Sequence, residues 1–499
     1  MGADIGTTGC RVCVYGARGD LAVSANTDYP LLTPRAGWVE QSPEEIYAAL
    51  GLTVREAIAN LPHSPDRIRS ITFSSVLHGI FPVSRDGDPT HPMLTWADSR
   101  AEPYIDRLRS RLDAASLYAR TGCPLHPMYP LAKLLWFRHD RPEIFARAHR
   151  FISIKEFVVQ RLTGRAAVDR SVASGTGFFD LRQGRWDLEA LDAAGVGVDH
   201  LSPVYSTTYA IRDWAAEELG LPKDTPLVLG AGDGPLSTLG AGAVGSHQYT
   251  ATIGTSGAVR RCVPAPLTDA TARNWCYNLT DDVWVIGGAI NNGGLALRWF
   301  RDTFAPGEPY DALVREAAAI DAGSGGLIFL PFLTGDRAPY WNSRSRGVFF
   351  GLTLNHTRAH LARATLEGVL YAMYSVFAAL KRLGAGAGAV EILASGSFTR
   401  SSAWVQMMAD VFGHPIVLPG AGDASAFGAA ALGMLATGDL ESIEAIGRLM
   451  TAPLAVLQPD RARHATYQEL FGLYERLYRN LVDPFETIAG IQERLPSED

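Results

Sequence analysis

Short apolar runs that end in glycine-rich turns recur along this chain. Residues 227–229 form a run typical of a buried strand, and the turn 230–234, Gly-Ala-Gly-Asp-Gly, follows it directly. Pro235 then suits the first turn of a helix. A second apolar run, 249–253, ends in the turn 254–257, Gly-Thr-Ser-Gly. Strands that alternate with helices in this way predict an α/β fold.

The turn after the second run repeats a turn near the start of the chain. Residues 4–9, Asp-Ile-Gly-Thr-Thr-Gly, agree with residues 252–257, Thr-Ile-Gly-Thr-Ser-Gly, at four of six positions. The two copies lie about half the chain apart, and each precedes a further β-type run. The repeat predicts two similar domains, residues 1–243 and 244–499, each supplying one phosphate-facing hairpin to a shared cleft.

Helix signals are clear at several other places. Ser42-Pro43-Glu44-Glu45 combines an N-cap serine, a proline at the first helical position and a glutamate at the third, which predicts a helix to about Leu61. Amphipathic patterns predict further helices over 359–383 and 462–481.

Composition and charge narrow the class of protein. A chain of 499 residues suits two domains, and 47% hydrophobic with 19% charged residues is typical of a globular protein. A net charge of −7 argues against a broad nucleic-acid-binding face. No apolar run predicts a membrane span or a signal peptide, so we expect a cytoplasmic protein. The five cysteines include one Cys-x-x-Cys spacing without a second pair, which does not predict a metal site.

The turns point to phosphoryl transfer. A carboxylate between glycines at the end of a strand, as at Asp233, lies on exposed backbone and fits a general base, with a helix N-cap as the alternative. Turns rich in Gly, Thr and Ser present N–H and hydroxyl groups to a phosphate. Asp4 fits a partner of Mg²⁺, with a turn-capping carboxylate as the alternative. The P-loop pattern is absent from the sequence, and the G-x-G-x-x-G match at 240–245 falls at the end of a helix rather than at its start.

Other polar groups stand at strand ends or on helices. His78, Trp96, Asp98 and Arg100 combine flat apolar surface with hydrogen-bonding groups, which suits a polyol; the alternative is a core tryptophan beside a surface ion pair. Lys133 lies on a predicted helix, where a lysine is usually solvated. The segment 291–294, Asn-Asn-Gly-Gly, precedes a predicted helix whose N-terminus is a candidate anion site.

Two longer motifs make the chain similar to the FGGY carbohydrate kinases, which have the actin-like ATPase fold. Residues 347–352, followed after seven residues by 360–367, match that family's C-terminal pattern. Residues 128–136, Met-Tyr-Pro-Leu-Ala-Lys-Leu-Leu-Trp, match its other pattern, from which His139 departs. The resemblance covers essentially the whole chain. It implies an α/β protein of two actin-like ATPase (ribonuclease H-like) domains with a cleft between them, and ATP-dependent phosphorylation of a sugar.

The resemblance also implies a role for each matching residue. Asp233 would be the general base, and Asp4 with Asp233 would assist Mg²⁺. The residues expected to contact ATP and its phosphates are Thr7, Thr8, Arg11, Gly254, Thr255, Ser256, Gly294, Arg298, Gly396, Ser397 and Arg400. Many relatives have Asn or Gln where Arg298 and Arg400 stand. The residues expected on the sugar side are His78, Gly79, Trp96, Asp98, Arg100, Lys133 and Asn291.

Within the family, the stretches 121–128, 151–156 and 291–294 are most similar to the gluconate kinases. That branch implies conversion of D-gluconate to 6-phospho-D-gluconate, with the substrate carboxylate met by Lys133, Arg100 or Arg337. Two alternatives stay open: a xylulokinase or other pentulose or polyol kinase, and a non-catalytic sugar- and ATP-binding sensor. The expected partners are the sugar or sugar acid and ATP, with no nucleic acid or membrane. The sequence leaves the oligomeric state open, a homodimer included.

Overall fold

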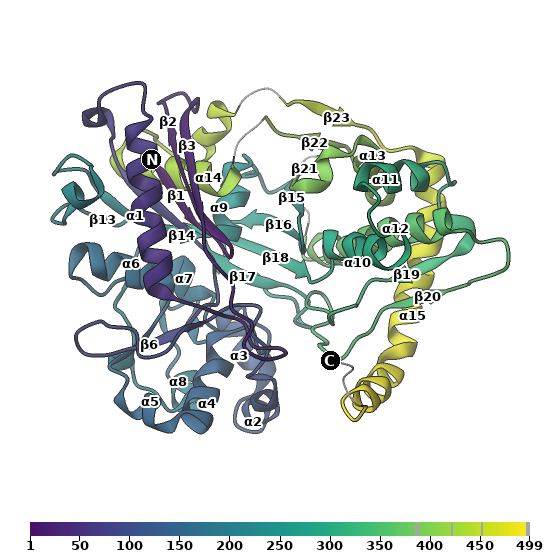
Figure 1. Ribbon diagram of the computed structural model, residues 1–499, viewed down its shortest axis with the longest axis horizontal. Coiled ribbons are helices and arrows are strands. Elements are labelled where there is room, and N and C mark those ends of the chain that lie inside the picture. Colours follow the sequence, from purple (N-terminus) through teal and green to yellow (C-terminus); the bar gives the residue numbers. More distant parts are fainter. Residues whose placement is uncertain (385–388, 421–422, 451–452, 496–499) are drawn as a thin grey trace. The chain divides into compact units, whose positions relative to one another are not determined.

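The structure, a computed structural model, describes residues 1–384, 389–420, 423–450 and 453–495 (Figure 1). The chain divides into two compact units. The first contains Met1–Val244, Cys262–Ile286 and Ala421–Met450, and the second contains Gly245–Arg261, Gly287–Gly420 and Thr451–Asp499. The first transition therefore follows Val244, and the chain then returns to the first unit twice.

The first unit is built on a six-stranded sheet with the order β13-β14-β5-β1-β2-β3 (Figure 1). Its strands are β1 (Gly2–Ile5), β2 (Gly9–Tyr15), β3 (Leu21–Asp28), β5 (Ile71–Ser75), β13 (Ala210–Ile211) and β14 (Leu227–Gly232). β1, β5 and β14 run parallel to one another, whereas β2, β3 and β13 are antiparallel to their neighbours. The carboxyl ends of the three parallel strands therefore meet at one edge, where binding groups collect in open α/β sheets.

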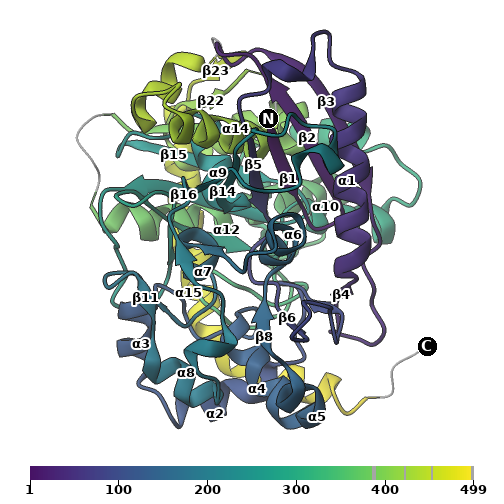
Figure 2. The same ribbon diagram turned by 90° about the vertical axis from the view of Figure 1, so that its left-hand side faces the viewer.

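Helices cover both faces of this sheet. The helices of the first unit are α1 (Pro43–Ala59), α2 (Ile105–Arg109), α3 (Ala114–Thr121), α4 (Pro130–Asp140), α5 (Pro142–Arg147), α6 (Ile154–Thr163), α7 (Arg170–Ser174), α8 (Leu188–Ala194), α9 (Asp233–Gly240) and α14 (Ala424–Thr437). α1 packs on β2 and β3, as Figure 2 also shows, whereas α14 packs on β1, β5 and α9. Because side chains alternate along a strand, the two helices meet different residues of β1.

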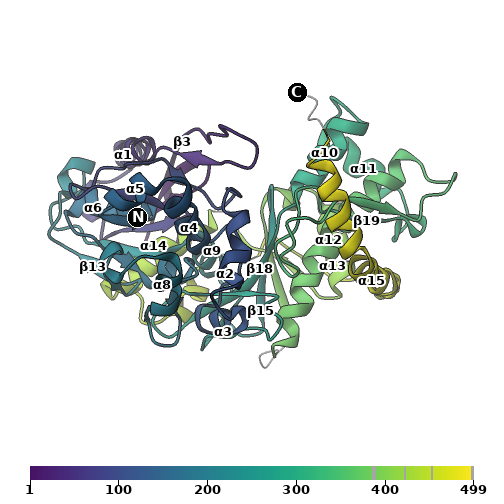
Figure 3. The same ribbon diagram turned by 90° about the horizontal axis from the view of Figure 1, so that it is seen from below.

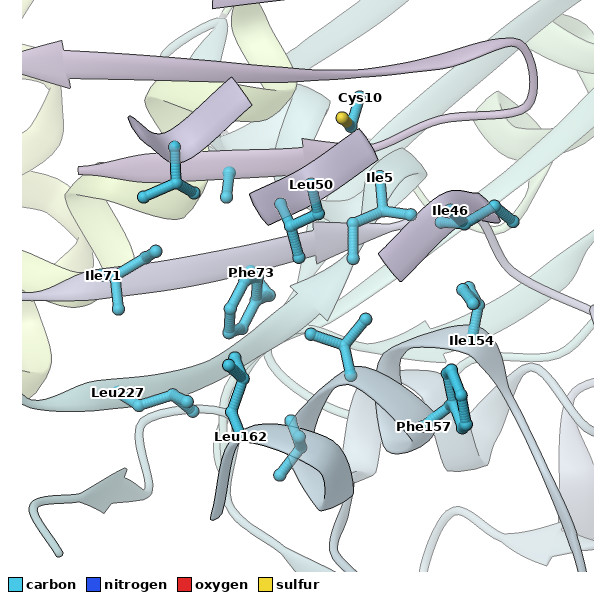
Figure 4. Close-up of a cluster of buried hydrophobic side chains, with 14 of the residues drawn as sticks. Ile5, Cys10, Ile46, Leu50, Ile71, Phe73, Ile154, Phe157, Leu162 and Leu227 are labelled. Atoms are coloured by element: carbon cyan, nitrogen blue, oxygen red, sulfur yellow. The ribbon is translucent and has the colours of Figure 1, made fainter. Parts of the chain in front are cut away.

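The face that meets α1 is apolar. Ile5 and Phe73 belong to one buried cluster with Ile46 of α1, together with residues of α6 (Figure 4). On the other face, α14 approaches Gly2 so closely that a Cβ there would lie 1.9 Å from the carbonyl oxygen of Ala426. The absence of a side chain at Gly2 thus permits the close packing of α14 on the sheet.

A second sheet has the order β17-β18-β16-β15-β21-β22-β23. Its strands are β15 (Gln248–Ile253), β16 (Gly257–Val263), β17 (Trp275–Asn278), β18 (Trp284–Ile290), β21 (Glu391–Ser395), β22 (Ile416–Leu418) and β23 (Ala455–Leu457). β15, β21 and β22 are parallel, with β16 and β23 antiparallel at either side. In the first sheet, β1, β5 and β14 occupy the places of β15, β21 and β22, and β2 and β13 occupy those of β16 and β23. The predicted repeat is therefore confirmed as two copies of one topology.

Helices of the second unit pack around α12. They are α10 (Gly294–Phe304), α11 (Tyr310–Ala318), α12 (Arg358–Arg382), α13 (Ser402–Phe412) and α15 (Arg461–Gln492). α12 contacts α10, α11 and α13, and α13 contacts α15 (Figure 3). The remaining strands form short pairs, namely β4 (Glu40–Gln41) with β7 (Met93–Leu94), β6 (Phe81–Val83) with β8 (Arg150–Ile152), β9 (Val168–Asp169) with β12 (Val204–Tyr205), β10 (Phe179–Asp180) with β11 (Arg185–Trp186), and β19 (Ile328–Leu330) with β20 (Val348–Phe350).

Element boundaries follow the sequence signals closely where caps are strong. The Ser42 hydroxyl accepts a hydrogen bond from the Glu45 N–H at 3.3 Å, so α1 begins where the sequence predicted. The predicted end of the last helix near 481 was wrong, because α15 continues past Pro484 to Gln492 and buries Phe485 and Ala489. Among the residues that the structure describes, none of the helices has both the length and the apolar character that a membrane span requires.

Candidate active site

The hairpin between β1 and β2 carries the first predicted phosphate turn. The Gly6 N–H donates to the Gly9 carbonyl at 3.0 Å, which closes the turn around Thr7 and Thr8. The Trp96 indole N–H donates to the Thr7 hydroxyl at 3.0 Å, and the Gln41 amide donates to the Thr7 carbonyl at 2.7 Å. One residue of the predicted phosphate hairpin is thus in direct contact with one residue of the predicted sugar side.

Asp4 lies on β1, paired with Arg11 on β2 and with Ser74 on β5. The Ser74 hydroxyl donates to Oδ1 of Asp4 at 2.5 Å. Burial and then the charge of Asp423 raise the pKa of Asp4 to about 7, against the lowering effect of the Ser74 hydrogen bond. Asp4 is therefore a carboxyl group that exchanges its proton near neutral pH and that responds to nearby charge.

Asp423 is a residue that sequence reasoning did not place in the site. It is the N-cap of α14, where its Oδ1 accepts from the Ala426 N–H at 2.9 Å, and its Oδ2 lies 2.6 Å from Nη1 of Arg11. Arg11 is thus held at the start of α14. The signal for Asp423 was present, because it precedes a helix rich in Ala and Gly.

Asp233 is the first residue of α9, directly after β14. Gly230 has a φ of 74° within a register shift of β14, and a Cβ there would lie 1.9 Å from the Phe73 carbonyl oxygen, so only glycine fits. The Gly234 N–H donates to Oδ1 of Asp233 at 2.7 Å, and the carboxylate is partly exposed. The local sequence therefore presents this carboxylate at the carboxyl edge of the first sheet.

His78 follows β5 in a conformation that is rare for residues other than glycine. Its φ is 68°, and its Nδ1 lies 2.7 Å from the Gly175 carbonyl oxygen. The rings of Tyr129 and Tyr277 pack against the imidazole, with centroids 5.0 and 5.6 Å away, and their hydroxyls lie 2.9 Å apart. At Gly79 a Cβ would approach the sulfur of Met93 to 2.6 Å, which accounts for the glycine.

Tyr277 contacts the predicted site residue His78, and sequence reasoning did not name it. It comes from β17 and stacks on Trp275 with ring centroids 4.3 Å apart, and its hydroxyl lies 3.5 Å from Nε2 of His78. The alternation of aromatic residues over 275–278 was the available signal. Aromatic faces with hydroxyl and imidazole groups form the kind of wall that binds a polyol.

Asp98 and Arg100 connect the segment that follows Trp96 to residues 38–40. The Arg100 guanidinium lies 2.7 Å from both Asp98 and Glu40, and its side chain is only 1% exposed. It lies over the ring of Trp38, with its central carbon 3.8 Å from the ring centroid. Asp98 also accepts a hydrogen bond from the Val39 N–H at 2.7 Å. The charge of Arg100 is therefore balanced within the protein by two carboxylates.

Lys133 is fully buried, and the expectation of a solvated lysine on this helix was wrong. Its ammonium donates to the carbonyl oxygens of His78, Thr95 and Met128 at 2.8, 2.6 and 2.8 Å. α4 has almost no solvent face over its first two turns, so the usual exposure of a helical lysine does not apply here. An ammonium has three donors, and here all three are used on the backbone.

The hairpin between β15 and β16 carries the second predicted phosphate turn. The Gly254 N–H donates to the Ser256 carbonyl at 2.9 Å, and the Gly254 carbonyl accepts from the Gly294 N–H at 2.7 Å. The Thr255 carbonyl accepts from the N–H of Gly293 at 3.0 Å. The start of α10 is thus fixed on this turn, which brings together Gly254, Thr255, Ser256 and Gly294.

The two hairpins differ at one equivalent position. Thr252 takes the place of Asp4 in the repeat, and its hydroxyl lies 2.9 Å from that of Ser395, as Asp4 bonds Ser74. Gly396 follows with a φ of 100°, and a Cβ there would lie 2.3 Å from the Ile253 carbonyl oxygen. The second copy thus keeps a side-chain hydrogen bond between the equivalent strands without the carboxylate.

The other residues of the second unit that were predicted to bind ATP or the sugar differ in exposure and contacts. Ser397, Arg298 and Arg400 are exposed. The Asn291 amide donates to the Thr334 carbonyl at 3.0 Å. The guanidinium of Arg337, which is largely buried, donates to the Ile290 carbonyl at 3.2 Å.

The carboxylates of the first unit fit Mg²⁺ in their chemistry. The charges of Asp423 and Asp233 both raise the pKa of Asp4, so they oppose its ionisation, and a divalent cation nearby would favour the ionised form. Over the described part of the chain, no group of three or more His, Cys, Asp or Glu side chains is arranged to enclose a metal ion. Mg²⁺ would therefore be held largely through water and phosphate oxygens, as it prefers.

Two sheets of one topology, each with a Gly-Thr hairpin, define an actin-like ATPase fold. Residues 1–240 match the N-terminal domain, and residues 249–437 the C-terminal domain, of the FGGY family of carbohydrate kinases. The chain belongs to the FGGY family of carbohydrate kinases. It is accordingly an enzyme with ATP as its co-substrate.

Relatives extend this similarity over the whole length. The chain is 40% identical over 508 aligned residues to the gluconokinase of Bacillus subtilis (strain 168), covering 99% of this chain and 98% of that protein. The crystal structure of gluconate kinase from Lactobacillus acidophilus is similar with a TM-score of 0.92 and 33% identity, covering 98% of this chain and 99% of the other. A ligand-bound structure described as xylulose kinase from the same organism gives the same four values.

Proposed function

We propose that this kinase transfers the γ-phosphoryl group of ATP to D-gluconate, giving 6-phospho-D-gluconate and ADP. The observation that carries the proposal is the 40% identity to a gluconokinase over 99% of the chain. The xylulose kinase similarity, at 33% identity, makes a pentulose the second candidate substrate.

Asp233 is the proposed general base. Its carboxylate accepts the proton of the gluconate 6-hydroxyl while that oxygen bonds to the γ-phosphorus. The bond from the γ-phosphorus to the β–γ bridging oxygen breaks, and ADP leaves with the electron pair. The place of Asp233 at the first turn of α9, partly exposed and held by the Gly234 N–H, supports this role. Mg²⁺, when bound, offsets the charge of the β- and γ-phosphates.

The remaining roles follow the chemistry of each group. Backbone N–H groups and hydroxyls of the two hairpins are proposed to bind phosphate oxygens, with Arg11 as a cationic partner in the first unit. His78, Trp96 and Tyr277 are proposed to contact the sugar hydroxyls. Lys133, Arg100 and Arg337 all make hydrogen bonds or ion pairs within the protein, so these contacts do not single out one of the three for the substrate carboxylate.

The decisive experiment measures ADP release with Mg·ATP against gluconate, xylulose, ribulose, glycerol and erythritol. We expect kcat/KM for gluconate to exceed that for every other compound by at least about 100-fold. The product should be identified as the 6-phosphate by phosphorus and carbon NMR. Preference for a pentulose would replace the sugar acid and keep the family. Binding of ATP without turnover on any compound would favour the sensor alternative.

A further inference from the structure

Lys133 joins three segments that lie far apart in the sequence. The three carbonyls that accept its hydrogen bonds belong to His78 after β5, Thr95 after β7 and Met128 before α4. Each carbonyl belongs to a peptide group next to a proposed sugar-side or wall residue: His78 itself, Trp96 and Tyr129. Hydrogen bonds that hold these three peptide groups also hold the Cα positions of His78, Trp96 and Tyr129.

We propose that Lys133 is a positioning residue for sugar binding, whose ammonium holds His78, Trp96 and Tyr129 in their binding arrangement. The inference rests on the proposed function, because it takes those residues to form the sugar side. Lys133 acts through the backbone and does not touch the substrate.

The backbone at His78 shows why such a tie is needed. A non-glycine residue at a φ of 68° is strained and persists only where its surroundings hold it. The Lys133 ammonium holds the carbonyl of His78, and the Gly175 carbonyl holds its imidazole. Removing the Lys133 bond releases the His78 carbonyl, while the Gly175 carbonyl and the rings of Tyr129 and Tyr277 still contact the imidazole.

Burying a cation in the core costs desolvation free energy. A hydrophobic side chain of similar volume is often neutral or stabilising in place of a buried charge. The nearest charged groups, Asp98 and Arg100, act on Lys133 in opposite directions, and Arg100 is itself paired with Glu40. The three carbonyls are therefore the groups that account for an ammonium at this position.

The pH dependence of sugar binding can distinguish a positioning role of the Lys133 ammonium from a role in packing alone. Burial lowers the pKa of Lys133 to about 7, so above neutral pH the group loses a proton and one of its three donors. Burial raises the pKa of Tyr129 well above its ordinary value, so this phenol stays neutral over the same range. Among these side chains, Lys133 is the one expected to change charge between about pH 7 and 9.

The test compares Lys133→Met with Arg363→Met. Arg363 is also a buried cation, paired with Glu367 at 2.6 Å on α12 in the second unit, whereas His78, Trp96 and Tyr129 belong to the first unit. We expect Lys133→Met to raise KM for gluconate at least about tenfold, with KM for ATP and kcat within about threefold. Arg363→Met should lower Tm without raising KM for gluconate. Equal KM values in wild type and Lys133→Met would overturn the proposal.

Two further measurements cover the remaining cases. The first uses wild type alone, in case Lys133→Met does not fold, and the second needs no substrate, in case gluconate is not the substrate. In wild type, KM for the phosphorylated sugar should rise from pH 7 to pH 9, and a flat profile would contradict the proposal. Hydrogen exchange, which needs no substrate, should increase in Lys133→Met over 78–79, 95–98 and 126–129 while α1 stays protected. An increase spread evenly over the first unit would indicate a merely structural lysine. Failure of the proposed function would instead appear as absent turnover on gluconate in wild type.

Discussion

Nη1 of Arg11 lies 2.6 Å from Oδ2 of Asp423, so the first hairpin is paired with the start of α14, 412 residues later. α14 packs closely on α9, where a Cβ at Gly240 would lie 1.8 Å from the Ala424 carbonyl oxygen. α9 begins at Asp233. The pair therefore links the proposed phosphate hairpin to the helices that position the proposed base.

Asp423 has two separable functions, as a helix cap and as an ionic partner. Asp423→Asn keeps a good cap and removes the charge, so it should change the free energy of unfolding by no more than about 1 kcal/mol, because Arg11 is half exposed. Asp423→Ala also removes the cap and should cost about 1 kcal/mol more. Urea unfolding of both variants measures the difference. Equal stabilities would show that the cap contributes nothing.

Arg11→Met should raise KM for Mg·ATP about tenfold, because a cation is lost from the proposed phosphate hairpin. KM for gluconate should stay within about twofold. Steady-state kinetics with each substrate varied in turn give both constants. Arg69→Met is the matched control, since Arg69 also pairs with an aspartate of the first unit, Asp439, at 3.5 Å and lies outside both hairpins. A similar loss in the two variants would argue against a phosphate contact for Arg11.

Asp233→Asn should lower kcat by at least about 100-fold, because an amide cannot accept the hydroxyl proton. The amide oxygen can still accept the Gly234 N–H, so folding and ATP affinity should stay close to wild type. The rate of ADP release gives kcat, and calorimetric titration with ATP gives the ATP affinity. Turnover near the wild-type value would remove Asp233 from the role of base.

Asp4 makes stability depend on pH in a defined direction. Its pKa is raised from 3.8 to about 7, so between these values it is protonated in the folded protein and ionised in the unfolded chain. The folded state binds more protons there, and stability is lost as pH rises, by at most about 1.4 kcal/mol per pH unit.

Asp4→Asn removes this loss and can still accept the Ser74 hydrogen bond. Its stability relative to wild type should therefore be greater at pH 8 than at pH 5, as measured by urea unfolding. Asn26→Ala, a substitution on β3 that removes no titratable group, serves as the control and should give the same difference from wild type at both pH values. A constant difference for Asp4→Asn would mean that Asp4 has an ordinary pKa.

The sequence by itself determined the features that depend on neighbouring residues. The Gly-Thr turns, the cap at Ser42 and the glycine turn before Asp233 are local, because short-range hydrogen bonds and allowed backbone angles set them. The repeat of the first turn suggested two similar domains. The functional roles assigned to Asp233, His78 and the hairpin residues remain predictions.

The tertiary structure alone decided how groups from distant segments are used. Lys133 is on a helix, where a lysine is usually solvated, and its three acceptors are backbone carbonyls, which have no sequence signature. Arg100 is neutralised by Glu40, 60 residues earlier, and His78 meets Tyr277, 199 residues later. Charge state and orientation depend on burial and on partners, and those are fixed only when strands and helices pack.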